Sequence, residues 1–441
     1  MQGDVISGRT PGMSHGFARR DLLTGKGRLR HMLTIRKSRR PGLVRGCRRA
    51  DLGFSWMRPG RGVRALAAAG VIAVAAGSGA VPAQAAAGYP LPVTTVSGQN
   101  YDTPDPGVLL YKGTFYGFST DGGLREWTAP EAGGPWTTPA DVLVRSSLPG
   151  WVDTAKGIWG PHMIQTTSGT FVVYFSAALN GTAGNPPGSD AKPASGARCI
   201  GTATSPNPTG PFSVAARPLV CFTQYGAADT MTGDPGNRVL GEGALASQPS
   251  FVTINGQREL FLVYKTQGDP GQPPQQVTIR MVRLADADGT TVLGDSHQLL
   301  SSGTGSFLDT IEVQALVQNG SWFILFVAHG NWDSCNYSTE WFKSQHIWAW
   351  QNNGGTTLLT SAGSGLCGPG DADVTASEVA GQDRIFVDGW VQESSGRIST
   401  IPLGAGTPPQ ENVNAARVMY AAILRFASDG YTPVIGEYLG Q

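Results

Sequence analysis

A short motif that occurs five times constrains what this chain can fold into. In each copy, a turn glycine is followed by large β-forming side chains, as in Gly-Thr-Phe-Val-Val-Tyr-Phe. The five glycines are Gly113, Gly169, Gly256, Gly320 and Gly381, separated by 56, 87, 64 and 61 residues. Repeats of this length that contain several short strands predict a β-propeller with one blade per repeat. We therefore expect an all-β protein, a five-bladed β-propeller.

Short strands separated by turn residues continue through residues 86–441. The sharpest hairpin has Asn255-Gly256 between apolar runs, and this pair favours a type I′ turn because both positions need positive φ. The 61 glycines and 30 prolines suit many tight turns. No long window has the 3.6-residue period of an amphipathic helix. Residues 86–441 are therefore expected to form a single all-β domain.

The first 85 residues differ from the rest in charge. They contain sixteen lysines and arginines and three aspartates, a net charge of +13, whereas the whole chain has a net charge of +1. Residues 86–441 therefore carry a net charge of −12. This negative charge argues against nucleic-acid binding, because that function needs a basic surface that neutralises phosphates.

Residues 57–85 have the three parts of a signal peptide. A basic stretch precedes an apolar run at 65–76, which is too short to span a bilayer, and Ala83-Gln84-Ala85 is a small-x-small cleavage signal. We expect cleavage near Ala85, secretion, and no membrane association after processing. Residues 1–56 are then a basic upstream segment, explained either by a start assigned too early, with Met57 as the true start, or by a long basic region of the signal peptide.

Four cysteines follow the leader, and an even number in an exported protein suggests disulfide bonds. Cys199 begins one expected strand and Cys221 ends the next, so a hairpin would set them side by side. We predict the pairs Cys199–Cys221 and Cys335–Cys367, and the other two pairings of four cysteines remain open. A zinc site is not expected, because the sequence has no Cys-x-x-Cys and no histidine at ligand spacing.

Three polar residues occur at corresponding places just before copies of the motif, namely Asp105, Gln248 and Glu312. Taken alone, Asp105 before a proline would be a turn residue, and Glu312 at a strand start would be solvated. Equivalent places on the blades of a propeller converge at one end of its channel. We therefore expect these three side chains to form a common site.

These motifs resemble those of glycoside hydrolase family 43, whose members are five-bladed propellers that cleave arabinose- and xylose-containing polysaccharides. The resemblance covers about residues 98–436 and rests on the order and spacing of several motifs. They are Pro-Asp105-Pro-Gly-Val, Ile-Trp-Gly-Pro-His162, Gln248-Pro-Ser-Phe-Val, Glu312-Val-Gln-Ala-Leu-Val and Gly-Pro-Gly-Asp371-Ala-Asp-Val.

The resemblance implies inverting acid/base hydrolysis. This chemistry needs two carboxyl groups about 6.5–9.5 Å apart, one to protonate the leaving oxygen and one to activate a water. Asp105 matches the family's general base and Glu312 its general acid. Gln248 stands where the family has a third carboxylate beside the acid, so its neutral amide predicts a slower enzyme, a more acidic optimum or no activity. Restoring the charge by Gln248→Asp is expected to raise activity or to shift its pH optimum upward.

A second departure from the family is Asp371, which stands where related enzymes usually have a histidine near a metal ion, often calcium. A carboxylate is a good ligand for a hard cation. Asp371 is therefore expected either to hold a structural calcium ion or to make a salt bridge. The acid/base chemistry itself requires no cofactor.

Flat aromatic side chains bind sugars because the C–H faces of sugar rings stack on them. Trp159, Trp332 and Trp390 fall where loops would meet the channel mouth, and we expect Trp159 and Trp332 in the substrate groove. His162 is expected beside the substrate or as a hydrogen-bonded rim residue. Arg417, in the last expected strand, resembles a family arginine near the substrate.

The sequence therefore predicts a secreted, monomeric glycosidase of the arabinanase, arabinofuranosidase or xylosidase type, whose partner is a plant-type or cell-wall polysaccharide. A catalytically weak or inactive propeller that binds glycan is the chief alternative, favoured by Gln248 and Asp371. A protein-interaction platform would explain the repeats but not the two placed carboxylates. The Pro/Gly-rich segment 183–198 and the segment 223–247 would shape the groove or be passive surface loops.

Overall fold

The structure is a computed structural model that describes residues 89–440, except 144, 181–197, 222–242, 268–276, 303–309, 353, 377–381 and 405–413. The expected signal peptide and basic upstream segment lie outside the described residues, as do most of the two expected groove loops. The described residues belong to one compact unit, residues 82–441.

The described residues are almost entirely strand and turn, so the all-β prediction is confirmed. They form 22 strands, one 3-10 turn, η1 (Arg145–Ser147), and one four-residue helix, α1 (Ser361–Ser364). None of the described helices is long and apolar enough to cross a membrane. Turn glycines such as Gly113 and Gly256 have positive φ, as the repeated motif requires.

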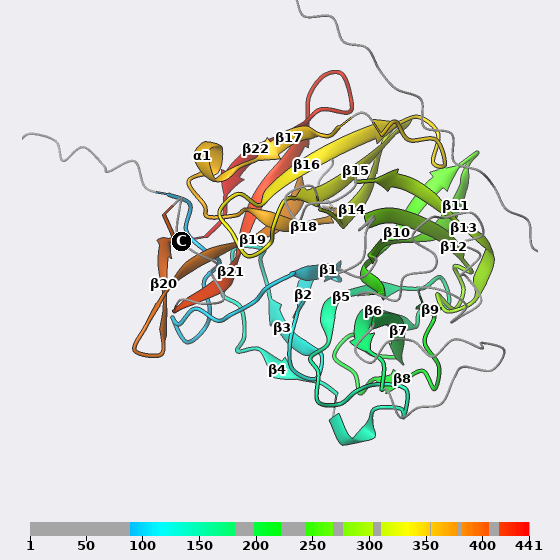
Figure 1. Ribbon diagram of the computed structural model, residues 1–441, viewed down its shortest axis with the longest axis horizontal. Helices are drawn as coiled ribbons and strands as arrows, with labels where there is room; N and C mark the ends of the chain where they lie inside the picture. Colours follow the sequence, from blue (N-terminus) through cyan, green and yellow to red (C-terminus); the bar gives the residue numbers. More distant parts are fainter. Residues whose placement is uncertain are drawn as a thin grey trace, which may run out of the picture. The chain divides into compact units, whose positions relative to one another are not determined.

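The strands fall into five successive antiparallel groups (Figure 1). The first contains β1 (Gly107–Tyr111), β2 (Thr114–Ser119), β3 (Arg125–Ala129) and β4 (Ala140–Asp141). The second contains β5 (Trp159–Gln165), β6 (Phe171–Ala178), β7 (Arg198–Ser205), β8 (Ser213–Val214) and β9 (Val220–Cys221). The third contains β10 (Gly243–Ile254), β11 (Gln257–Gln267), β12 (Val277–Leu284) and β13 (Val292–Ser301).

The last two groups complete the order. The fourth contains β14 (Ile311–Asn319), β15 (Trp322–His329), β16 (Ser338–Ser344) and β17 (Thr356–Leu359). The fifth contains β18 (Gly370–Thr375), β19 (Asp383–Ser394), β20 (Arg397–Pro402), β21 (Ala415–Phe426) and β22 (Pro433–Tyr438). One parallel pairing, Gly243 with Arg198, joins the second and third groups into one sheet. Glycine permits it, because a Cβ on Gly243 would lie 2.1 Å from the Arg198 carbonyl oxygen.

The first strands of the groups contact one another in a closed sequence. β1 contacts β5, β5 contacts β10, β10 contacts β14, β14 contacts β18, and β18 contacts β1. The groups follow one another in chain order around these strands, from cyan through green and yellow to red in Figure 1. The starts of the first strands therefore lie near one another, although they come from distant parts of the sequence.

Apolar clusters fill the space between neighbouring groups and fix these strands. Phe118 of β2 packs with Phe171 and Phe175 of β6 in one cluster, and all three side chains are buried. Burying a side chain of this size stabilises the fold by roughly 1.5–3 kcal/mol. The core therefore lies between the sheets and leaves the starts of the first strands to line a site.

Both predicted disulfide bonds are confirmed. Cys199 of β7 is bonded to Cys221 of β9, so the bond closes the hairpin expected from the sequence. Cys335, after β15, is bonded to Cys367, which precedes β18. The second bond therefore links the fourth group to the start of the fifth.

Candidate active site

A cavity of about 470 Å³ opens at the starts of the first strands. Seven of the eight residues that the sequence predicts for the site line this cavity: Asp105, Trp159, His162, Glu312, Trp332, Asp371 and Arg417. Gln248 is the exception. Lys265 and Trp390 also line it. A volume of this order is typical of small-molecule and oligosaccharide sites.

An uncommon backbone conformation recurs where these strands begin. Asp105, Gly160, Ala246 and Asp371 all have φ between 48° and 53°, in the left-handed region. Aspartate tolerates this region better than most residues because its short polar side chain bonds locally. All four residues line the cavity. The shared turn is the local structure that directs Asp105 and Asp371 toward each other.

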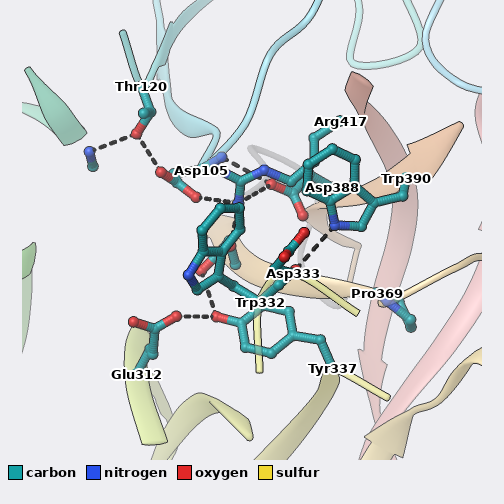
Figure 2. Close-up of polar contacts among 12 residues, drawn as sticks. Asp105, Thr120, Glu312, Trp332, Asp333, Tyr337, Pro369, Asp388, Trp390 and Arg417 are labelled. Atoms are coloured by element: carbon teal, nitrogen blue, oxygen red, sulfur yellow. Dashed lines mark hydrogen bonds and ion pairs between the residues drawn. The ribbon is translucent and has the colours of Figure 1, made fainter. Parts of the chain in front are cut away.

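Asp105 is held as a carboxylate by two donors. Arg417 Nη1 donates to Oδ1 at 2.7 Å, and the Thr120 hydroxyl donates to Oδ2 (Figure 2). Burial alone would raise the pKa of Asp105, but the Arg417 charge and hydrogen bonds from Thr120 and Asp371 hold that pKa below its usual range. An ionised carboxylate at the cavity wall suits a group that accepts a proton from water.

Arg417 also contacts two further carboxyl groups. Its Nη1 lies 3.2 Å from Asp371 Oδ2 and 3.2 Å from Asp388 Oδ2. Asp388 is fully buried, and burial raises its pKa to about 7. Burial and the charges of Asp105, Asp388 and Glu312 raise the pKa of Asp371 well above its usual range. One guanidinium is therefore shared by three carboxyl groups, and of these the pKa of Asp105 is lowered while those of Asp371 and Asp388 are raised.

The expected calcium ion can be tested against this arrangement. Asp105, Asp371 and Asp388 offer oxygens that all lie within 4.8 Å of one another. Arg417 already contacts all three of these carboxyl groups. The cation that these three carboxyl groups contact here is therefore the Arg417 guanidinium, and a structural calcium ion stays a prediction. Of the two expectations for Asp371, the contact present is the salt bridge.

Glu312 lies on the other side of the cavity, on β14. Its Oε1 accepts a hydrogen bond from the Lys265 ammonium, whose side chain is 3% exposed, and its Oε2 accepts one from the Tyr337 hydroxyl. The second bond is visible in Figure 2, where the tyrosine hydroxyl is directed at the carboxyl group. Both oxygens of Glu312 thus act as acceptors in this structure.

Gln248 takes a place that differs from the expectation. It is buried within β10, and its Nε2 donates to Asp373 Oδ1 at 3.0 Å. A bulge between Leu245 and Gln248 changes the register of β10 against β11. Leu245 and Ala246, at the bulge, line the cavity and Gln248 does not. The side chain instead links β10 to β18.

Aromatic residues flank the carboxyl groups. Trp159 is 38% exposed, and the Arg198 guanidinium lies 3.2 Å from its ring centroid. Trp332 is 37% exposed and stacks on Trp390, whose Nε1 donates to the Trp332 carbonyl at 2.9 Å. Trp390 is 6% exposed and thus supports Trp332 from behind. The two exposed indoles are rigidly held surfaces on which a sugar ring can stack.

Lys265, Asp388 and Tyr337 are among the site residues that were not predicted from the sequence. Lys265 and Asp388 each interrupt an apolar strand with a charged side chain, and such an interruption is a usable signal. Tyr337 follows a loop after β15, and nothing in its neighbourhood marks it.

Comparisons with known proteins agree with the fold. No protein-family model and no curated protein matches this chain. A crystal structure of a thermostable family-43 glycoside hydrolase is 16% identical, with a TM-score of 0.55, and the match covers 80% of this chain and 98% of that one. The α-L-arabinanase of Cellvibrio cellulosa, complexed with arabinohexaose, is 15% identical, with a TM-score of 0.52 over 77% and 96% of the two chains.

A third solved structure is similar. The endo-1,4-β-xylanase of Bacteroides thetaiotaomicron is 14% identical, with a TM-score of 0.51 over 77% of this chain and 96% of that one. At these identities the likeness establishes the fold alone. This chain has the fold of family-43 glycoside hydrolases.

Proposed function

We propose that this chain is a secreted glycoside hydrolase, a five-bladed β-propeller that cleaves arabinose- or xylose-containing polysaccharides. The observation that carries the proposal is the cavity in which Asp105 and Glu312 lie among exposed tryptophans. Each group of strands would be one blade, because the first strands contact one another in a closed sequence. Similar solved structures are an arabinanase and a xylanase, which supports this substrate class.

In the proposed mechanism, Asp105 is the general base and Glu312 is the general acid. Asp105 would take a proton from a water that attacks the anomeric carbon, and Glu312 would give a proton to the leaving glycosidic oxygen. The lowered pKa of Asp105 supports the first role. For the second role, Glu312 must first acquire a proton, because both of its oxygens accept hydrogen bonds, one from Lys265 and one from Tyr337.

Trp159 and Trp332 would hold the sugar rings, and Arg417 and His162 would line the same groove. Oxidised cysteines and the expected signal peptide support secretion, and we propose a monomer. A catalytically weak propeller that binds glycan is a second candidate. Two observations favour it. Glu312 is paired with Lys265, and at position 246, which lines the cavity, β10 has an alanine and no carboxylate.

The test is hydrolysis by residues 86–441 of nitrophenyl α-L-arabinofuranoside, nitrophenyl β-D-xyloside, linear arabinan and arabinoxylan between pH 4 and 8. Glu312→Gln preserves the size of the side chain and is expected to lower the rate of polysaccharide hydrolysis by about 10²- to 10⁴-fold. Retention of full activity in this variant would show that Glu312 is not the acid. Binding to polysaccharide without hydrolysis by the unmodified chain would support the glycan-binding alternative.

A further inference from the structure

Tyr337 connects the two sides of the cavity. It is fully buried, and its hydroxyl lies 2.5 Å from Glu312 Oε2 and 3.0 Å from Asp371 Oδ1. Figure 2 shows the Tyr337 hydroxyl directed at the Glu312 carboxyl group. One phenol oxygen is thus within hydrogen-bond distance of two carboxyl groups.

Hydrogen counting restricts what these contacts can be. A tyrosine hydroxyl carries one hydrogen and can donate it to only one of the two carboxyl groups. The other contact is a hydrogen bond only if that carboxyl group carries a proton and donates it to the phenol oxygen. With both Glu312 and Asp371 ionised, one of the two contacts would join two acceptors.

The charged neighbours favour Asp371 as the protonated partner. Glu312 faces the Lys265 ammonium from β11, which compensates its charge. Asp371 faces two other carboxyl groups, Asp105 and Asp388, and shares the single Arg417 guanidinium with them. The pKa of Asp371, raised by burial and by these negative charges, agrees with this assignment.

We propose that Asp371 stores the proton that Glu312 donates as the general acid, and that the Tyr337 hydroxyl transfers it between them. The inference rests on the proposed function. The Oδ1–H bond of Asp371 breaks as the phenol oxygen of Tyr337 takes the hydrogen. The original phenol O–H bond breaks at the same time, and its hydrogen forms the Oε2–H bond of Glu312. Tyr337 remains neutral throughout.

The same contacts close the proton cycle. In each turnover Glu312 loses a proton to the leaving oxygen and Asp105 gains one from the attacking water. Oxygens of Asp105 and Asp371 lie within 4.8 Å of each other and both carboxyl groups contact Arg417 Nη1, so the gained proton can return to Asp371. The base, Asp371, Tyr337 and the acid then form one path, and no net proton is consumed. Asp371 and Tyr337 act through Glu312 and are positioning residues.

The first experiment compares Tyr337→Phe with the unmodified chain on two substrates. The ring is kept and only the hydroxyl is removed. On an arabino- or xylo-oligosaccharide, whose leaving group needs a proton, kcat is expected to fall roughly 10- to 100-fold with little change in KM. On the 2,4-dinitrophenyl glycoside, whose leaving group needs none, the fall should be much smaller. As pH falls, the loss on the oligosaccharide should shrink, because solvent then protonates Glu312.

Tyr420→Phe is the matched control. Tyr420 is also a fully buried tyrosine, on β21, and it does not line the cavity. Neither substrate should respond to this change. Equal losses on both substrates for Tyr337→Phe, independent of pH, would indicate a structural role and overturn the proposal, as would no loss on the oligosaccharide.

A second experiment does not depend on activity. The infrared spectrum of the unmodified chain at pH 7, minus that of Asp371→Asn, should contain a carboxylic-acid C=O band, and this band should shift in Tyr337→Phe. The subtraction is needed because Asp388, with a pKa of about 7, contributes a band of the same kind. A difference spectrum that lacks the band would overturn proton storage even in an active enzyme. A chain that shows the band but hydrolyses none of the substrates would reject the proposed function while supporting the shared proton.

Discussion

The starts of β1 and β10 have the same backbone turn and opposite chemistry. Asp105 has a φ of 53° and Ala246 a φ of 48°, and both line the cavity. On β1 the turn presents a carboxylate to Arg417. On β10 it presents the methyl group of alanine, which makes no hydrogen bond that could offset the energetic cost of the left-handed conformation. The comparison teaches that the fold determines where a side chain reaches the cavity, and that the residue found there determines the chemistry.

Removing the carboxylate from β1 should have the largest effect. Asp105→Asn keeps an oxygen that can accept from Arg417 or Thr120 but removes the base, so we expect activity to fall about 10³-fold. The measurement is kcat/KM on arabinan and on xylan, with circular dichroism to show that the variant is folded. If Asp105→Asn were nearly as active as the unmodified chain, the two strand starts would not differ in catalysis.

Placing a carboxylate at Gln248 of β10 tests the assignment made from the sequence. Because Gln248 donates to Asp373 and does not line the cavity, Gln248→Asp would set two buried carboxyl groups against each other. We now expect a loss of stability of about 2–4 kcal/mol instead of a gain in activity. Urea unfolding measures it, and Gln392→Asp, at an exposed position of β19, is the control that should change little. A rise in activity would instead support the assignment of Gln248 to the position of the third catalytic carboxylate.

Placing a carboxylate at Ala246 should instead make β10 resemble β1. Ala246→Asp puts a negative charge at the cavity wall, and by repulsion between like charges it should favour protonation of the acid and move the activity optimum toward higher pH. We expect an effect of roughly tenfold or less on activity above pH 6. Ala246→Gly is the matched control, because it relieves the left-handed backbone by about 1 kcal/mol without adding charge. A glycine variant with the same pH profile as the aspartate variant would contradict the charge explanation.

Much of the architecture could be predicted from the sequence, because strand order and turns depend on local patterns. The glycine-led motif marked five of the strand pairs, and Cys199 and Cys221 marked the hairpin they close. Asp105 and Glu312 could be placed in one cavity because each lies at the start of a first strand.

The remaining features depend on register and on contacts between distant segments. Gln248 follows a bulge in β10 and lies outside the cavity, and no local pattern in the sequence predicts that bulge. Tyr337, just before β16, contacts Glu312 of β14 and Asp371 of β18, which are 25 and 34 residues away in the sequence. Such contacts follow from packing, which the spacing of motifs does not describe.

Because of the Cys199–Cys221 bond, the support of Trp159 depends on whether the protein's surroundings are oxidising or reducing. The bond fixes the beginning of β7, and the residue just before it, Arg198, covers one face of Trp159. In a reducing compartment the two thiols would leave that strand end held by weaker contacts, and the indole would lose part of its rigid backing. If the proposed function holds, the oxidised chain would therefore present a more firmly supported indole to a sugar ring than the reduced chain.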